Sequence, residues 1–339
     1  MNRIFQYQMF ALFILLICGD IAYAADHVTT LDVGRRASDI EFSPNGDTAY
    51  VNNFDDNTIS VIDTGRNRVI ATIRVGEAPK RPVAATNDRV YVPNSGRGRA
   101  GNGTVSVIDT TTKRVIENIE VGVNPSAGAA TFVHCEVQPC VNDRVLITNF
   151  NRGRIGTVSV IDTATNRVVR TIEVGKGPID IGIPFLGRKA YIANNNNRTV
   201  TVIDIPSFDI VATIPVPGYP TAIFANANSN LHTVFVSHNN PNGISAINTQ
   251  RMEVSNTLRT SYKPGRIASP VVGAINHILV PIFAENRVDR IDFPRRRRVE
   301  TIAIDNPRSV EINLRHRGHD TYVVGNNEVK VFNLGFAEE

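Results

Sequence analysis

The chain has 339 residues, of which 42% are hydrophobic and 20% are charged, so it can bury a core and is not disordered. Its 24 glycines, 18 prolines and three cysteines exclude collagen-like, low-complexity and disulfide-dense scaffolds. The formal net charge is +4 and is made from 30 arginines and only 6 lysines. Arginine is suited to flat, bidentate contacts with carboxylates and phosphates.

The first 24 residues have the three-part pattern of a secretory signal peptide, with a weakly positive start, an apolar run at 9–18 and small residues at Ala22 and Ala24. The apolar run is roughly half the length that a bilayer-spanning helix needs. We therefore expect cleavage after Ala24, a periplasmic or secreted protein, and no transmembrane segment. Lipidation of Cys18 is the alternative, but the large Ile17 stands where a lipoprotein cleavage site has a small residue.

One short element recurs seven times along the rest of the chain. It reads ISVIDT at 59–64, VSVIDT at 105–110 and 158–163, VTVIDI at 200–205, ISAINT at 244–249, VDRIDF at 288–293 and VKVFNL at 329–334. The spacings between successive copies are 46, 53, 42, 44, 44 and 41 residues, with a mean of 45. A YVNN-like element precedes each copy, and a VIATIRVG-like element follows the first four copies clearly and the next two more weakly. These runs are rich in Val, Ile, Thr and Tyr and are separated by turn residues, which is typical of strands.

A further short run precedes each YVNN-like element, so each repeat contains four strands. Seven such repeats predict an all-β fold, a seven-bladed β-propeller, over residues 25–339. The last repeat stops after its third strand at Val329–Leu334, and the VTTLDVG run at Val28–Gly34 matches the missing fourth strand. We expect this N-terminal strand to complete the last blade and close the ring, which leaves only short sheet edges exposed.

The combination of YVNN at 50–53, ISVIDT at 59–64 and VIATIRVG at 69–76 resembles the YVTN-family β-propeller repeat of bacterial exported and archaeal surface-layer proteins. The resemblance extends over essentially the whole chain after residue 24 and is strongest in the first four repeats. It implies the propeller fold. It implies no single activity, because propellers with this repeat serve binding, adhesion, electron transfer and catalysis.

Residues that most repeats share are expected to stabilise the fold. Asp63, Asp109 and Asp162 each precede a turn, where a carboxylate can accept backbone N–H bonds. The same structural interpretation applies to the residues that end the YVNN-like elements (Asn52, Asn94, Asn149 and Asn194) and to the turn glycines after the fourth strands (Gly76, Gly122 and Gly175).

The third repeat carries an insertion that contains Cys135 and Cys140. In an oxidising, exported setting, two cysteines five positions apart are expected to form a disulfide. A metal site that also uses His134 is the alternative, but zinc usually takes a fourth ligand and more closely spaced cysteines. We therefore expect no bound metal, and no sequence pattern indicates another cofactor.

Basic residues are concentrated in the links that a propeller places on one face, namely those between the second and third strands and those between blades. The candidate ligand-binding residues are Lys80, Arg81, Arg97, Arg99, Arg152, Arg154, Arg198, Lys263, Arg266, Arg287 and Arg308. Acidic residues in these links are fewer: Asp55, Asp56, Glu77, Glu285 and Asp305. Converging cations attract anions, so this face is predicted to bind an anionic ligand or partner.

The basic run 295–298 is assigned to the opposite face, where only Phe293 could stack on a base, so nucleic acid is not an expected partner. His238 replaces the terminal Asn of a YVNN-like element, and Glu285 lies in the matching link of the next blade. This pair loosely resembles the site of streptogramin-type lyases on seven-bladed propellers, although the wider motif is absent.

The leading hypothesis is an exported, monomeric, non-catalytic binding or scaffold protein for an anionic ligand or an unidentified protein partner. A lyase or lactonase that uses His238 and Glu285 is one alternative. A role as accessory or redox partner of a periplasmic quinoprotein or cytochrome system is the other.

Overall fold

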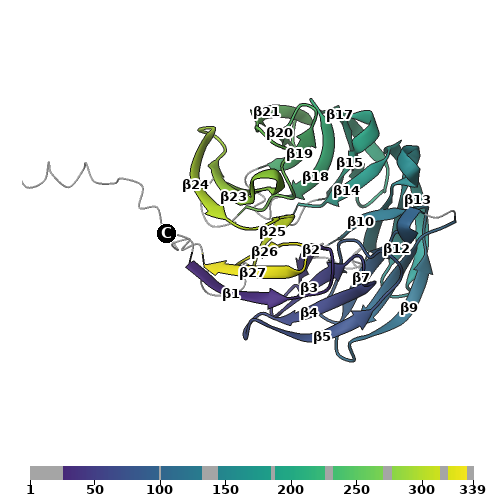
Figure 1. Ribbon diagram of the computed structural model, residues 1–339. Coiled ribbons are helices and arrows are strands. Elements are labelled where there is room, and N and C mark those ends of the chain that lie inside the picture. Colours follow the sequence, from purple (N-terminus) through teal and green to yellow (C-terminus); the bar gives the residue numbers. More distant parts are fainter. Residues whose placement is uncertain are drawn as a thin grey trace, which may run out of the picture.

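The computed structural model describes residues 26–98, 101–131, 144–184, 188–225, 232–269, 277–313 and 320–333. Seven antiparallel sheets follow one another around a ring (Figure 1), which confirms the all-β, seven-bladed propeller. The signal peptide, its cleavage site, and Cys135 and Cys140 lie outside the described residues. None of the helices in the described part has the length and hydrophobicity needed to cross a membrane.

The blades are described here from the innermost strand outward. Blade one contains β2 (Ala37–Phe42), β3 (Thr48–Asn53), β4 (Thr58–Asp63) and β5 (Arg68–Arg74). Blade two contains β6 (Val83–Ala84), β7 (Arg89–Asn94), β8 (Thr104–Asp109) and β9 (Arg114–Glu120). Blade three contains β10 (Pro125–Ala130), β11 (Arg144–Asn149), β12 (Ile155–Asp162) and β13 (Arg167–Lys176). Blade four contains β14 (Pro178–Gly182), β15 (Lys189–Asn194), β16 (Thr199–Asp204) and β17 (Ile210–Pro215).

The last three blades depart more from the repeat. Blade five contains β18 (Tyr219–Ala225), β19 (Thr233–Asn239), β20 (Gly243–Asn248) and β21 (Glu253–Arg259). Blade six contains β22 (His277–Ile282), β23 (Arg287–Asp292) and β24 (Arg297–Ala303). Blade seven contains β25 (Ser309–Ile312), β26 (Asp320–Val324), β27 (Glu328–Asn333) and β1 (Asp26–Asp32). In blade six an isolated antiparallel bridge between Ala268 and Leu279 takes the place of a named inner strand.

The N-terminal strand closes the ring as the sequence predicts. β1 pairs antiparallel with β27, from Asp26 opposite Asn333 to Asp32 opposite Glu328, and the two strands lie side by side in Figure 1. Leu31 of β1 packs in one apolar cluster with Val329 of the last repeat and Ile40 of the first. The two ends of the repeat array therefore share both a sheet and a core.

The core lies between neighbouring blades. The middle strands are buried on both faces, because a neighbouring blade covers each side of every sheet. Their repeated Val, Ile and Tyr residues fill the space between the blades. One cluster joins Tyr191 and Val200 of blade four to Ile223 and Val234 of blade five. Equivalent clusters recur around the ring.

The turn function expected for the repeated aspartates is confirmed. The Asp63 carboxylate accepts the backbone N–H of Arg66 at 3.0 Å, and Asp109 accepts that of Thr112 at 2.8 Å. Asp162 accepts the N–H of Thr165 at 2.9 Å. The hydrogen bond from Thr112 lowers the pKa of Asp109, because it stabilises the ionised form of the carboxyl group.

The asparagine interpretation needs one correction, because the equivalent residue in the first repeat is Asn53 rather than Asn52. Asn53 donates to Ser60 Oγ on the next strand at 2.9 Å, and Asn94 does the same to Ser106 at 2.9 Å. Asn52 points instead toward the inner strand, where it donates to Ser38 Oγ at 2.8 Å. The YVNN sequence carries two adjacent asparagines, and the alternation of a strand sends them to opposite faces.

The repeated glycines after the fourth strands have a role beyond the turn function expected for them: Gly76 and Gly122 lie at bends, as expected, whereas Gly175 lies within β13. A Cβ on Gly76 would lie 2.5 Å from the Asn94 side chain, and one on Gly122 would lie 2.7 Å from Asn149. Gly175 stands in the same relation to Asn194. These glycines allow the backbone to pass directly over the buried amide groups, so close approach explains their presence.

Deleting Val28–Gly34 removes most of β1 and leaves the edge of β27 unpaired. We expect aggregation or a large loss of stability, because an exposed strand edge is a template for association. Thermal unfolding and size-exclusion chromatography measure the effect. The matched control is Val28→Thr, since Val28 is half exposed and the strand remains. An unchanged melting temperature in the deletion variant would contradict the closure.

Candidate functional site

Two sets of links meet on one face of the ring, as the connectivity predicts. Arg35, in a link between blades, donates to Asp56 Oδ1 at 2.6 Å in the link between β3 and β4. Asn124, in another link between blades, donates to the Ser95 carbonyl in the link between β7 and β8 at 3.0 Å. We call this surface the link face.

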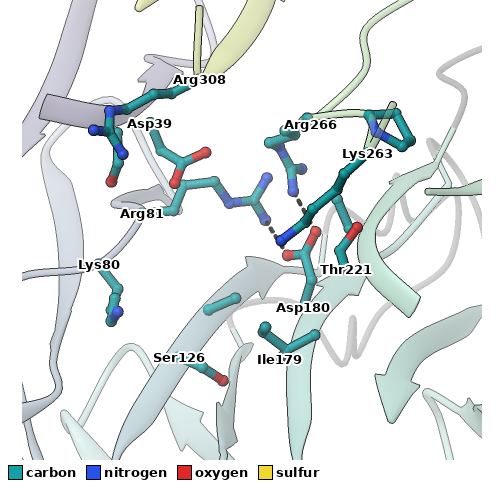
Figure 2. A pocket seen from close by; sticks show the side chains of 15 residues that line it. Asp39, Lys80, Arg81, Ser126, Ile179, Asp180, Thr221, Lys263, Arg266 and Arg308 are labelled. Carbon is teal, nitrogen blue, oxygen red and sulfur yellow. Dashed lines mark hydrogen bonds and ion pairs between the residues drawn. The ribbon is translucent and has the colours of Figure 1, made fainter. Parts of the chain in front are cut away.

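A cavity of about 290 Å³ opens on the link face at the end of the central channel (Figure 2). Its walls come from the starts of the inner strands and from the links that precede them. The lining charged residues are Asp39, Lys80, Arg81, Asp180, Lys263, Arg266 and Arg308. Five of these seven are cations, which makes the cavity electropositive. We call it the channel-mouth cavity.

Asp180 connects four blades inside this cavity. Figure 2 shows Arg81 and Arg266 converging on its carboxylate from blades two and six. Arg81 lies 3.9 Å from Oδ1, Arg266 forms a hydrogen-bonded ion pair with Oδ2, and the backbone N–H of Ile223 donates to Oδ2 at 2.8 Å. Asp180 is 4% exposed. Such a buried carboxylate depends on its partners, because an unpaired charge in this setting is costly.

Arg81 also crosses the channel. It donates from Nη2 to the carbonyls of Gly128 at 2.7 Å and Ile181 at 3.3 Å, and its Nη1 lies 3.9 Å from Glu41. Burial opposes the charge of Arg266, but the nearby carboxylates of Asp180 and Asp39 outweigh it and raise the pKa of Arg266. Both guanidinium groups are held in fixed positions by these contacts.

Further carboxyl groups lie along the inner strands. Burial raises the pKa of Asp39 and of Glu41, although Arg266 and Arg81 oppose the shift. Burial raises the pKa of Glu311 to about 7, with Arg266 acting in the opposite direction and Glu41 adding to the rise. The charge of the channel thus changes near neutral pH. The acidic groups predicted from the sequence lie only in the links, so these inner-strand carboxyls, Asp180 included, were not among them.

Three of the predicted cations face the channel-mouth cavity without a carboxylate partner. In the described part of the chain, no carboxylate oxygen lies within 4.0 Å of Lys80, Lys263 or Arg308. Lys80 lies 4.9 Å from the centre of the Phe54 ring, and Arg308 donates to Asn326 Oδ1 at 3.2 Å. Burial lowers the pKa of Lys80 and of Arg308. Asp39 lines the same cavity and attracts Lys80 and Arg308 without an ion pair within 4.0 Å, so an anion placed among the three cations would be attracted by all of them.

The other predicted cations are spread over the link face. Arg97 pairs with Asp55 and Glu77, at 3.4 Å each. Arg198 stacks 4.2 Å from the centre of the Tyr219 ring, and Arg287 pairs with Glu285 and Asp289. Arg152 and Arg154 are exposed, and Arg99 lies outside the described residues. The structure therefore gathers Lys80, Arg81, Lys263, Arg266 and Arg308 into one cavity and leaves the remaining cations around it.

His238 is fully buried and occupies the position of the repeated asparagine. Its Nδ1 lies 2.8 Å from the Pro241 carbonyl, which can only accept, so Nδ1 carries the proton. Nε2 is then free to accept from Ser245 Oγ at 3.1 Å. Burial lowers the pKa of His238, although the hydrogen bond with Pro241 opposes the shift. Glu285 forms an ion pair with Arg287, so both candidate catalytic groups are engaged in local contacts.

The chain matches no known family model and no curated protein. Solved structures do resemble it. Hydrazine synthase of Kuenenia stuttgartiensis aligns with a TM-score of 0.75 and 20% identity over 93% of this chain and 99% of that chain. The Cps50 (Swd1) β-propeller domain of Myceliophteria thermophila aligns with a TM-score of 0.71 and 10% identity over 91% and 99%. At these identities the likeness defines the class of fold, a β-propeller, and nothing finer.

Asp180→Ala leaves two buried guanidinium groups without their shared partner. We expect the free energy of unfolding to fall by about 3–5 kcal/mol, the range for breaking a buried ion pair from one side. Denaturant unfolding measures the change. Asp305→Ala, an exposed carboxylate on the same face, is the control and should cost no more than about 0.5 kcal/mol. Equal effects of the two substitutions would contradict the role of Asp180.

Glu311→Gln should stabilise the protein in a pH-dependent way. A carboxyl whose folded-state pKa lies above its unfolded value loses stability as the pH rises from about 4.5 to about 7, because burial opposes its ionisation. The melting temperature of the variant should equal that of the wild type near pH 4.5 and exceed it by a few degrees at pH 8. The exposed Glu120→Gln serves as control. A constant difference at all pH values would contradict the assignment.

Proposed function

We propose that this β-propeller is a non-catalytic binding protein that takes an anionic ligand, or an anionic group of a partner, in the channel-mouth cavity. The observation that carries the proposal is the convergence of Lys80, Lys263 and Arg308 on one cavity without carboxylate partners. From the signal-like pattern of the first 24 residues we further propose that it acts after export, in the periplasm or outside the cell.

The inner network supports this function by fixing the charges in place. Arg81 and Arg266 are held by Asp180, so a ligand meets donors that need little reorganisation. Preorganised donors lose less entropy on binding than flexible surface side chains do. The partly buried setting also strengthens each ionic contact relative to one in open water.

The two alternatives receive less support from the residues. A lyase or lactonase would need His238 as an accessible base, yet both of its ring nitrogens are used within the blade. A role beside a redox system rests on likeness of fold alone, because no residue described here points to electron transfer. A non-catalytic binding role therefore remains the function that the site supports best.

Citrate is a suitable test ligand, since it is small and carries several negative charges. Its binding should be detectable by calorimetry at low salt and should weaken as the salt concentration approaches about 0.3 M, because screening shortens the reach of charges. The double variant Lys263→Ala, Arg308→Ala should lose about tenfold or more in affinity, since contacts to charged groups contribute about 1.5–3 kcal/mol each.

Two further double variants separate a site from general attraction. Arg152→Ala, Arg154→Ala removes charge from the link face outside the cavity and should weaken citrate binding less than the cavity variant. Arg296→Ala, Arg297→Ala removes charge at the end of the turn between β23 and β24 and at the first residue of β24, on the opposite face, and should leave affinity unchanged. Equal losses from all three variants would indicate diffuse attraction only, and the proposed site would be abandoned.

A further inference from the structure

A second cavity, of about 520 Å³, lies beside the channel-mouth cavity on the link face. Its lining is mostly apolar and includes Phe54, Pro125, Phe150 and Ile179. The two cavities share Lys80, Ser126 and Ile179, so they adjoin each other at these residues. We call the second one the apolar cavity.

Hydrogen bonds between links hold the walls of the apolar cavity in place in the absence of a ligand. The backbone N–H groups of Phe150 and Asn151 donate to the carbonyls of Asn124 and Val123, at 2.9 and 3.0 Å. The Asn124 side chain in turn donates to Ser95. Three links from different positions in the ring are thereby joined, which holds Phe150 in place.

The link that follows Phe150 has an unusual backbone. Asn151, Arg152 and Gly153 all have positive φ values, of 47°, 54° and 76°. A Cβ on Gly153 would lie 2.4 Å from Asn196 Nδ2, so the turn fits closely against the neighbouring link. This conformation directs Arg152 to the apolar cavity, where it contributes to the lining.

Cations stand at the edges of this apolar space. Arg36, Lys80 and Arg97 lie 4.5, 4.9 and 5.3 Å from the centre of the Phe54 ring. Arg152 is exposed, and in the described residues no carboxylate lies within 4.0 Å of it. An apolar wall with a positive rim is complementary to a molecule that is apolar in its body and acidic at its ends.

We infer that the two cavities together form one site for an amphipathic organic anion. Its acidic group lies among Lys80, Lys263 and Arg308, and its aromatic or alicyclic body fills the apolar cavity beside Phe54 and Phe150. A small inorganic anion would leave the apolar cavity empty, and a neutral apolar compound would leave the three cations without a counter-charge. This inference rests on the proposed anion-binding function and specifies the ligand class.

Anilinonaphthalene sulfonate, an aromatic anion that fluoresces in apolar surroundings, is the probe, and citrate is the competitor. We expect one fluorescent site that citrate displaces. Phe150→Ala should weaken probe binding at least fivefold while citrate affinity stays within twofold of the wild type. Lys263→Ala, Arg308→Ala should weaken both ligands. Arg152→Ala, a substitution at an exposed position that does not threaten folding, should weaken the probe more than citrate.

The control is Ile116→Ser, Val169→Ser, which removes two exposed apolar residues from outer strands and should leave probe binding unchanged. If Phe150→Ala and Arg152→Ala both leave probe affinity unchanged while citrate still depends on Lys263 and Arg308, the amphipathic-ligand inference is overturned and the anion site stands. If citrate affinity does not respond to Lys263→Ala, Arg308→Ala, the anion site itself fails and the inference fails with it.

Discussion

The pairing of β1 with β27 is the contact on which the arrangement of the site depends. It joins residues from opposite ends of the chain and brings blade seven against blade one. Once the ring is closed, the inner strands β25 and β2 lie next to each other. Glu311 and Arg308 thereby enter the same channel as Asp39 and Glu41. Without closure these groups would be separated by the whole length of the repeat array, and the channel-mouth cavity would lack one of its walls.

The charges inside the channel are difficult to explain by stability alone. Buried ion pairs seldom stabilise a fold more than well-packed apolar residues of similar size, because both ions lose their hydration. The clusters between blades already supply an extensive apolar core. Arg81, Asp180 and Arg266 nevertheless cross the channel to one another, and Arg81 also binds two backbone carbonyls. A network of this kind fixes the position of positive charge, which is a property that binding needs and folding does not.

The repeat pattern was sufficient to predict the fold, because each repeated residue stabilises a turn, a strand or the contact with the neighbouring blade. The turn aspartates and the strand order follow from neighbours within one or two repeats, and the closing strand follows from the match between the N-terminal run and the strand that the last repeat lacks. The inner-strand charges could not be predicted in the same way. Asp180 and Arg266 are 86 positions apart and meet only across the ring. His238 is a different case. The sequence shows that it departs from the repeat, but it does not show the two hydrogen bonds that give His238 an asparagine-like role.

Departures from the repeat nevertheless indicate the position of the candidate site where they change a link between strands and not a strand itself. Residues 95–103, between β7 and β8, form the longest link between a second and a third strand, and the link between β11 and β12 contains three residues with positive φ. The apolar cavity lies at these two links, whereas the inner strands supply the charges of the channel mouth. The sheets can keep their repeated packing while the links alone differ from blade to blade. A ring of similar blades thus acquires one distinct side, which is the asymmetry that the proposed ligand, with its two chemically different ends, requires.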